Sequence, residues 1–185
     1  MNTRPGFRPI VFCALLLAVA ACGAPQAKSA GHSAAGHVTV DRDRHKAYTS
    51  IKSLAADSTV VLIAKAGSQA AEIDHHVPFT TTTMTVVSSL RGDAPSTFRL
   101  RQLGSAGSAD TPVAPSGSTY LLFLQPFELQ HGVPVAPDLF VTVGASSGKF
   151  QQQGSTFRKT DPDAQDLPAA VTEADVRAAT ATGTA

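Results

Sequence analysis

The chain has 185 residues, with 15 basic and 14 acidic side chains and a formal net charge of +1 at pH 7. The charges are scattered, without a basic stripe or an acidic tail. This excludes nucleic acid as an expected partner, because phosphate backbones are bound by clustered Lys and Arg. The length suffices for one domain with its own hydrophobic core, but not for two full domains.

The first 21 residues have the composition of an export signal. Arg4 and Arg8 precede an uninterrupted apolar run from Ile10 to Ala21. This run is too short to cross the roughly 30 Å of a bilayer core as a helix. A short apolar run behind basic residues and ahead of small ones is typical of a signal peptide. We therefore expect residues 1–21 to be removed from the mature protein.

The apolar run ends in Val19-Ala20-Ala21-Cys22, which resembles the lipobox of bacterial lipoproteins. The resemblance implies cleavage between Ala21 and Cys22 and lipid, palmitate included, on Cys22. The mature chain would then be anchored at the extracytoplasmic face of the cell membrane. The alternative is an ordinary secretory signal with an incidental cysteine. Cys13, the only other cysteine, lies inside the signal, so the mature chain could form no disulfide.

Residues 22–44 are small and polar, with almost no large apolar side chains. Such a segment cannot bury enough surface to offset the entropy of ordering, so we interpret it as a flexible tether. His32, His37 and His45 punctuate the segment and its border. Their spacing is loose for metal ligands, and we interpret them as solvated linker residues.

Residues 45–180 are predicted to form a single β-rich domain, followed by a tail at 181–185. The three-residue spacing of Tyr48, Ile51 and Leu54 predicts a short helix at its start. A second short helix is expected near the end of the chain. Its start is marked by a Thr-Glu-Ala-Asp sequence that resembles a capping box, and it runs to about position 179.

The segments between these two helices have the composition of strands, being rich in β-branched residues or alternating between apolar and polar ones. Strands are expected at Ser58–Ala66, Phe79–Leu90, Thr97–Leu103, Thr119–Gln125, Asp138–Val143, Lys149–Gln152 and Ser155–Arg158. In the third of these, Phe98 and Leu100 alternate with Arg99 and Arg101, which predicts one buried and one exposed face.

Two polar segments, Gly67–Val77 and Gly104–Gly117, are expected to be long loops. Short strands separated by turns predict a small antiparallel barrel or sandwich, with a short helix before and after it. A parallel sheet is not expected, because no helix of crossover length separates the strands.

The order of these segments from about Ala55 to Phe157 carries a resemblance. The stretches are DSTVVLIAKA, TVVSSLRGD, FRLRQL, GSTYLLFLQPF and LFVTVGASSGKF. They are similar to a set of small lipoproteins of high-GC Gram-positive bacteria, and they resemble the netrin-like, OB-type barrels of the metalloproteinase-inhibitor group. The resemblance implies a fold more than a function. The inhibitors bind zinc through an N-terminal cysteine amine, and this chemistry should not carry over because Cys22 would bear lipid.

The densest group of metal-capable donors is Asp74-His75-His76, with Glu72 just before it. Two imidazoles and a carboxylate could hold Zn or Cu. Neighbouring residues on an extended chain point to opposite sides, however, so a single ion would need a distorted loop. It would also need a further ligand from elsewhere, for example His131 or Asp138. The alternative interpretation is a set of exposed loop residues.

Two short motifs invite functional interpretations that their surroundings do not favour. Gly144–Gly148 matches the G-x-S-x-G nucleophile elbow, which needs a helix after the serine and a histidine downstream. A strand is predicted there instead, and the last histidine is His131. Arg91-Gly92-Asp93 spells an adhesion tripeptide, but Gly and Asp are also usual turn residues.

Two hypotheses about function follow. The leading one is a lipid-anchored, non-catalytic domain that presents a face or cleft to an envelope protein or a small ligand, with no cofactor. Its loops at 67–77 and 104–117 and the threonine-rich strand between them are the candidate contacts. The second is an envelope metal-binding protein or minor metalloenzyme that uses Asp74, His75 and His76.

Overall fold

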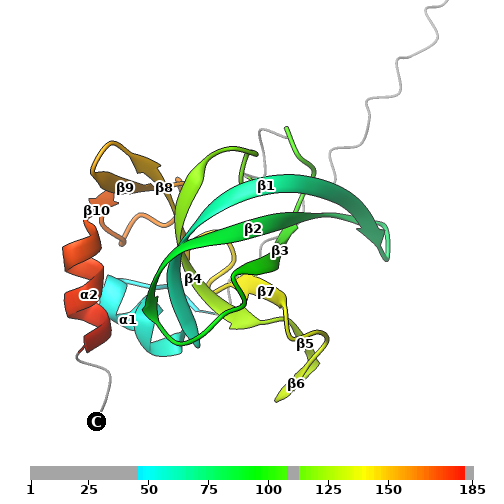
Figure 1. The fold of residues 1–185 in the computed structure, drawn as a ribbon, viewed down its shortest axis with the longest axis horizontal. Coiled ribbons are helices and arrows are strands. Elements are labelled where there is room, and N and C mark those ends of the chain that lie inside the picture. Colours follow the sequence, from blue (N-terminus) through cyan, green and yellow to red (C-terminus); the bar gives the residue numbers. More distant parts are fainter. Residues whose placement is uncertain (1–45, 108–112, 182–185) are drawn as a thin grey trace, which may run out of the picture. The chain divides into compact units, whose positions relative to one another are not determined.

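The computed structural model describes residues 46–107 and 113–181 (Figure 1). As predicted, the fold is mainly β, with 50% strand and one helix on each side of the sheet in the chain order. The elements are α1 (Ile51–Asp57), β1 (Val60–Asp74), β2 (Val77–Arg91), β3 (Thr97–Leu103), β4 (Thr119–Pro126), β5 (Glu128–Gln130), β6 (Val133–Pro134), β7 (Leu139–Thr142), β8 (Lys149–Gln153), β9 (Thr156–Lys159), β10 (Ala170–Val171) and α2 (Glu173–Ala181). The predicted signal, Cys22 and the tether lie outside the described residues. No helix in the described ranges is long and apolar enough to cross a bilayer.

Five strands form a ring in the order β1-β2-β3-β7-β4, and β4 pairs in turn with β1. A curled five-stranded sheet is the architecture of OB-type proteins. The ring is antiparallel except where β3 and β7 run parallel, with Arg99 opposite Leu139 and Leu100 opposite Phe140. The antiparallel sheet that the sequence predicts is therefore present, with this one parallel pair. The pair needs no crossover helix because β4, itself a strand of the ring, carries the chain back between β3 and β7.

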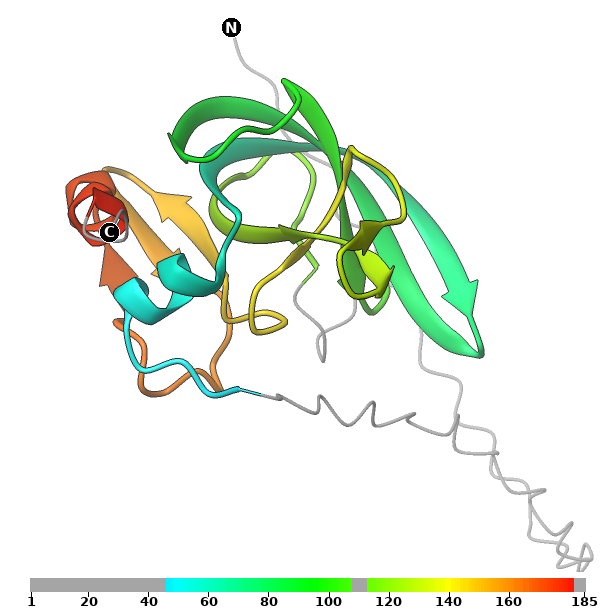
Figure 2. The same ribbon diagram turned by 90° about the horizontal axis from the view of Figure 1, so that it is seen from below.

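A smaller sheet region extends from the ring through β8, β9 and β10. One edge of β4 is shared end to end by two strands: β7 pairs with its last residues, Leu124 to Pro126, and β8 with Tyr120 to Leu122. Figure 2 shows both helices beside the β8–β10 strands. The tips of the β1–β2 and β5–β6 hairpins lie away from the helices (Figure 1).

The molecule has two hydrophobic cores, one on each face of β1 and β4. The helix-side core lies between the sheet and the helices, and the ring core lies inside the ring. The helix-side core includes Leu54, Val61, Ile63, Leu121, Phe123, Phe150, Phe157 and Val176. The ring core includes Leu62, Ala64, Met84, Phe98, Leu100, Tyr120, Leu122 and Phe140.

This double burial explains the two most apolar stretches of the chain. Successive residues of a strand point to opposite faces, so a strand between two cores must be apolar at every position. Val61 and Leu62, which follow one another in β1, are 0% and 1% exposed and belong to different cores. Leu121 and Leu122 of β4 behave in the same way.

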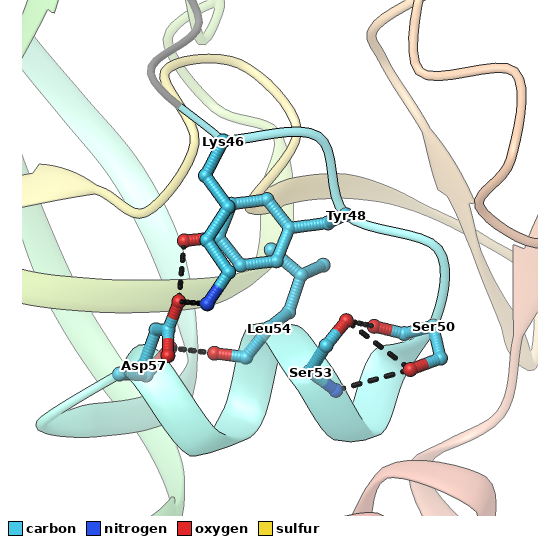
Figure 3. Close-up of polar contacts among 7 residues, drawn as sticks. Lys46, Tyr48, Ser50, Ser53, Leu54 and Asp57 are labelled. Atoms are coloured by element: carbon cyan, nitrogen blue, oxygen red, sulfur yellow. Dashed lines mark hydrogen bonds and ion pairs between the residues drawn. The ribbon is translucent and has the colours of Figure 1, made fainter.

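The chain enters the domain through a small polar cluster at α1 (Figure 3). Ser50 caps the helix, because its side chain accepts a hydrogen bond from the Ser53 backbone N–H. Asp57, at the helix end, accepts from the Tyr48 hydroxyl at 2.8 Å and from the Lys46 ammonium at 2.5 Å. Burial, followed by the hydrogen bond to Asp57, raises the pKa of Tyr48 to about 12. The Lys46 hydrogen bond lowers the pKa of Asp57.

The predicted loop at Gly67–Val77 is instead the outer part of a long hairpin. β1 continues to Asp74 and β2 begins at Val77, and the two strands pair over their full length with a bulge between Ala66 and Gln69. The turn consists of His75 and His76, with φ angles of +48° and +67°. Both central residues therefore adopt the left-handed conformation that matches the twist of a two-residue hairpin. The prediction of a loop is wrong because pairing with the threonine-rich β2 overrides the weak strand propensity of Ser, Ala and Glu.

The second helix begins as predicted, at a reciprocal cap. The Asp175 backbone N–H donates to the Thr172 side-chain oxygen at 3.2 Å, and the Thr172 backbone N–H donates to the Asp175 carboxylate at 2.8 Å. Besides the outer part of β1, the sequence prediction missed the shortest described strands, β5, β6 and β10. These three strands have two or three residues each, too few to show a periodic pattern.

Candidate functional site

A cavity of about 200 Å³ lies where β2, β3 and β7 meet the segment after β4. Its lining is mostly apolar, with a few polar side chains. The lining residues are Phe79, Arg101, Gln102, Leu103, Phe127, Val141, Thr142, Ala145, Ser146 and Lys149. We call it the Arg101 cavity.

Arg101 is held between two aromatic rings. Its guanidinium carbon lies 3.9 Å from the centroid of the Phe79 ring and 4.7 Å from that of Phe127. These distances are within the range of cation–π contacts. The Arg101 side chain is only 11% exposed. The planar cation therefore forms part of the cavity wall and connects β3 to residues that are distant in the sequence.

Two carboxylates of β1 complete the surroundings of Arg101. Its Nη2 donates to Asp74 at 2.9 Å, and its Nε lies 3.6 Å from a Glu72 oxygen. Glu72 also accepts a hydrogen bond from the Thr81 hydroxyl at 2.7 Å. The Arg101 hydrogen bond, followed by the contact with His75, lowers the pKa of Asp74. Arg101 thus fixes the outer end of the β1–β2 hairpin against β3.

Arg99, on the same face of β3, holds the other side of the site. Its Nε and Nη2 each donate to a different oxygen of Asp138 at 2.8 Å. Asp138 immediately precedes β7, after the β5–β6 hairpin. This two-point contact lowers the pKa of Asp138 and raises that of Arg99. The alternation predicted from the sequence thus places two arginines on one face, and each fixes one of the two segments that flank the cavity.

The two hairpins near the cavity carry exposed aliphatic side chains. Ile73, beside Asp74, is 80% exposed. Leu129 in β5 is 78% exposed, Val133 in β6 is 57% exposed, and Val135 is 49% exposed. None of these four side chains lines the cavity. Glu72 and Asp74 both face Arg101, so strand alternation turns Ile73 to the opposite face. Exposed apolar side chains on the two hairpins therefore form a separate candidate contact surface.

The predicted metal ligands Asp74, His75 and His76 lie at the tip of the β1–β2 hairpin, where Asp74 contacts both His75 and Arg101. His75 Nδ1 lies 2.7 Å from one Asp74 oxygen, and Arg101 donates to the other. The side chain of His75 is 96% exposed, and His76 is also exposed. In 46–107 and 113–181, no group of three or more His, Cys, Asp or Glu is arranged to hold a metal ion. Metal binding by Asp74, His75 and His76 stays a prediction.

The residues named as further metal ligands are placed elsewhere. Asp138 is paired with Arg99, and His131 lies in the turn between β5 and β6. Lipidation of Cys22 concerns a residue outside the described ranges.

The serine and RGD motifs have structural partners. Gly144–Gly148 connects β7 to β8, and a strand follows it where an elbow needs a helix. Within it, the Ser146 hydroxyl donates to the buried Asp161 at 2.8 Å. Arg91 ends β2 and donates to the Ala55 carbonyl oxygen, so the arginine of the tripeptide joins β2 to α1.

Sequence reasoning named neither Phe79 nor Phe127 as a site residue. The one local sign of the site was Arg101 itself, a charged residue in β3, which pairs with the threonine-rich strand β2. Nothing local indicates that two phenylalanines, 22 positions before and 26 after it, would enclose it. No protein-family model matches the sequence, and no curated protein is similar to it.

Proposed function

We propose that this protein is a lipid-anchored lipoprotein of the cell envelope whose β domain is a non-catalytic binding module. Its partner presents an apolar group to the Arg101 cavity. The anchor is inferred from the Val19-Ala20-Ala21-Cys22 sequence after a signal-like apolar run. The domain would then act at the extracytoplasmic face of the cell membrane.

The single observation that carries the binding proposal is the enclosure of Arg101 by Phe79 and Phe127 at a mostly apolar cavity. Cavities of this kind offer apolar area, and fixed polar groups at their wall orient a ligand. The charged groups here are used to hold the two flanking segments. This arrangement therefore favours ligand binding over catalysis.

The proposal is tested by photo-crosslinking from position 129 in intact cells, using the full chain with a photoreactive amino acid there. We expect capture of one reproducible envelope component. Capture should be lost when Phe127→Ala removes one wall of the cavity. The control is Val87→Ser, because Val87 is an exposed aliphatic residue of β2, at 64%, and lies outside the cavity lining.

Retention of the same captured component in the Phe127→Ala variant would overturn the assignment of this surface. The anchor is tested separately by Cys22→Ser. We expect this substitution to abolish labelling with a lipid precursor and to release the protein from the membrane fraction. A labelled Cys22→Ser protein would overturn the anchor without bearing on the cavity.

A further inference from the structure

A second cavity, of about 370 Å³, lies on the ring face of the strands β4, β8 and β9. Its lining is more polar than that of the Arg101 cavity. The lining residues are Gly107, Val113, Pro115, Tyr120, Lys149, Gln151, Gln153, Arg158, Lys159 and Thr160. We call it the Tyr120 cavity. Lys149 is the single lining residue that it shares with the Arg101 cavity.

Strand register places three polar side chains of this cavity in one row. Tyr120 of β4 lies opposite Gln151 of β8, and Gln151 lies opposite Arg158 of β9. Directly opposed residues of antiparallel strands project on the same face, with Cβ atoms about 5 Å apart. The row therefore presents a phenol, an amide and a guanidinium side by side.

Tyr120 is the unusual member of this row. The residue is 1% exposed. Within residues 46–107 and 113–181, its hydroxyl is the single buried side-chain oxygen or nitrogen without a well-formed hydrogen bond. Burial raises the pKa of Tyr120, and a contact with the Ser118 side chain partly opposes this rise. Ser118 also accepts a hydrogen bond from Gln151, at 3.2 Å. A buried hydroxyl that is poorly satisfied is costly, and such groups in folded proteins call for an explanation such as a ligand.

The charge of the lining indicates what such a ligand would carry. Among the described residues that line the cavity there are three basic side chains and no Asp or Glu. Lys149 is buried and already interacts within the domain. Lys159 donates to the carbonyl oxygens of Ala164 and Leu167, so its ammonium also serves the fold. Arg158 is exposed at the end of the row. A guanidinium binds an oxyanion through two parallel hydrogen bonds, and a phenol can donate a third.

We propose that the Tyr120 cavity binds a small organic anion, whose carboxylate or phosphate group is held by Arg158 and the Tyr120 hydroxyl. The body of the molecule would lie against Val113, Pro115 and the side chain of Gln151. The site is distinct from the Arg101 cavity, so it goes beyond the function proposed above and does not depend on it. Binding is non-covalent.

Calorimetric titration of the full chain in detergent micelles tests the proposal, using three probes of similar shape: benzoate, phenyl phosphate and benzamide. We expect at least one of the two anions to bind, and neutral benzamide to bind at least about tenfold more weakly, because hydrogen bonds to a charged group are the strong ones. Benzoate and phenyl phosphate distinguish a carboxylate ligand from a phosphorylated one. Equal binding of benzamide, or no binding of either anion, would overturn the proposal.

Three variants locate the site. Arg158→Gln and Tyr120→Phe should each weaken binding of the anion at least about tenfold. Lys65→Gln is the control, since it removes one positive charge from an exposed position outside the lining and should leave the affinity unchanged. Unchanged affinity in both cavity variants would overturn the assignment.

Tyr120→Phe has a second readout that a purely structural role predicts differently. Without ligand, the variant should melt at a temperature equal to or above that of the parent chain, because it removes a buried hydroxyl that makes no well-formed hydrogen bond. The anion should then raise the melting temperature of the parent more than that of the variant. A variant that melts lower without ligand would mean that the hydroxyl already supports the fold, and would overturn its assignment to a ligand.

Discussion

The two halves of the β1–β2 hairpin are stabilised by different physics. In the proximal half, the β1 residues Val60–Ala64 are all buried, between the helix-side core and the ring core. In the distal half, Ala70–Ile73 are all exposed, and the strand is held by Arg101 and by pairing with β2. β1 is thus buried among apolar side chains in its first half, and its second half is held by ion pairs with Arg101, whose guanidinium also contacts aromatic rings. The comparison suggests that stability resides in the proximal half and that the distal half is positioned for contact.

The largest effect is expected in the helix-side core, which buries one face of the proximal half. The residue to truncate is Phe123 of β4, which lies opposite Val61 of β1. Phe123 is fully buried in the helix-side core, where its ring packs edge-on against that of Phe150 at 6.1 Å. Phe123→Ala should lower the free energy of unfolding by about 3–5 kcal/mol, through lost burial and the cavity left behind. Urea unfolding measures this. Val87→Ala, at an exposed position of the β1–β2 hairpin, should change it by less than about 0.5 kcal/mol.

A backbone constraint in the same half gives the next effect. Gly92 has φ of +66°, and a Cβ there would lie 2.3 Å from the Thr59 carbonyl oxygen. Gly92→Ala should therefore cost about 2 kcal/mol or more, from the left-handed conformation together with the collision. Gly154 is a matched control with φ of +62° and no atom within 4 Å of a built Cβ. Equal losses for Gly154→Ala and Gly92→Ala would show that the collision is relieved.

Removing the cation of the distal half should loosen that half alone. Arg101→Met keeps most of the side-chain volume and removes the cation–π contacts and both ion pairs. We expect the local opening free energy of the amides in Thr80–Thr82 to fall by about 1–2 kcal/mol, as measured by hydrogen exchange. Amides of β4 should keep their protection. Arg177→Met, which breaks an exposed pair with Glu173, should leave both regions unchanged. Simultaneous loss of β4 protection would contradict the division of the hairpin.

The turn at the hairpin tip should accept a stabilising change. His76 has φ of +67°, a conformation that costs a residue with a side chain about 1 kcal/mol and costs glycine little. His76→Gly should raise the free energy of distal opening by about 0.5–1 kcal/mol in the same exchange experiment. A loss of protection would indicate that the imidazole makes a stabilising contact.

Acid should weaken the distal half first, and this effect is the smallest. Arg101 and Arg99 lower the pKa of Asp74 and of Asp138 below the ordinary value of 3.8. Their contribution is therefore complete above that value and is lost as the pH falls through the lower pKa of the folded state. Protection of the Thr80–Thr82 amides, relative to their intrinsic exchange rate at each pH, should fall in this range. The fall should be smaller at high salt, and Asp74→Asn should reduce the pH dependence. An equal loss of protection in β4 would speak against local opening.

The sequence predicted the elements that are recognisable locally. β3 was predicted at its observed bounds because Phe98, Arg99, Leu100 and Arg101 alternate without interruption, and the cap of α2 because Thr172 and Asp175 have the spacing of a capping box. The outer part of β1 was missed because its strand character comes from pairing with β2, which its own residues do not encode.

The candidate site was predictable only in part. Arg101 was placed on the correct face of β3, and the outer β1–β2 segment was named as a contact region, although as a loop. The enclosing rings of Phe79 and Phe127 depend on the parallel step from β3 to β7 and on the return of the chain after β4. Such packing of residues distant in the sequence has no local pattern. The poorly satisfied hydroxyl of Tyr120 is likewise visible only in three dimensions.

The position of β4 has a consequence for how the domain comes apart. It pairs with β1 along one edge and with β7 and β8 along the other, and its side chains enter both cores. Neither the ring nor the helix layer can separate while the other stays intact, because each would take half of this strand's contacts with it. We therefore expect the domain to melt as one cooperative unit, with fraying confined to the hairpin tips.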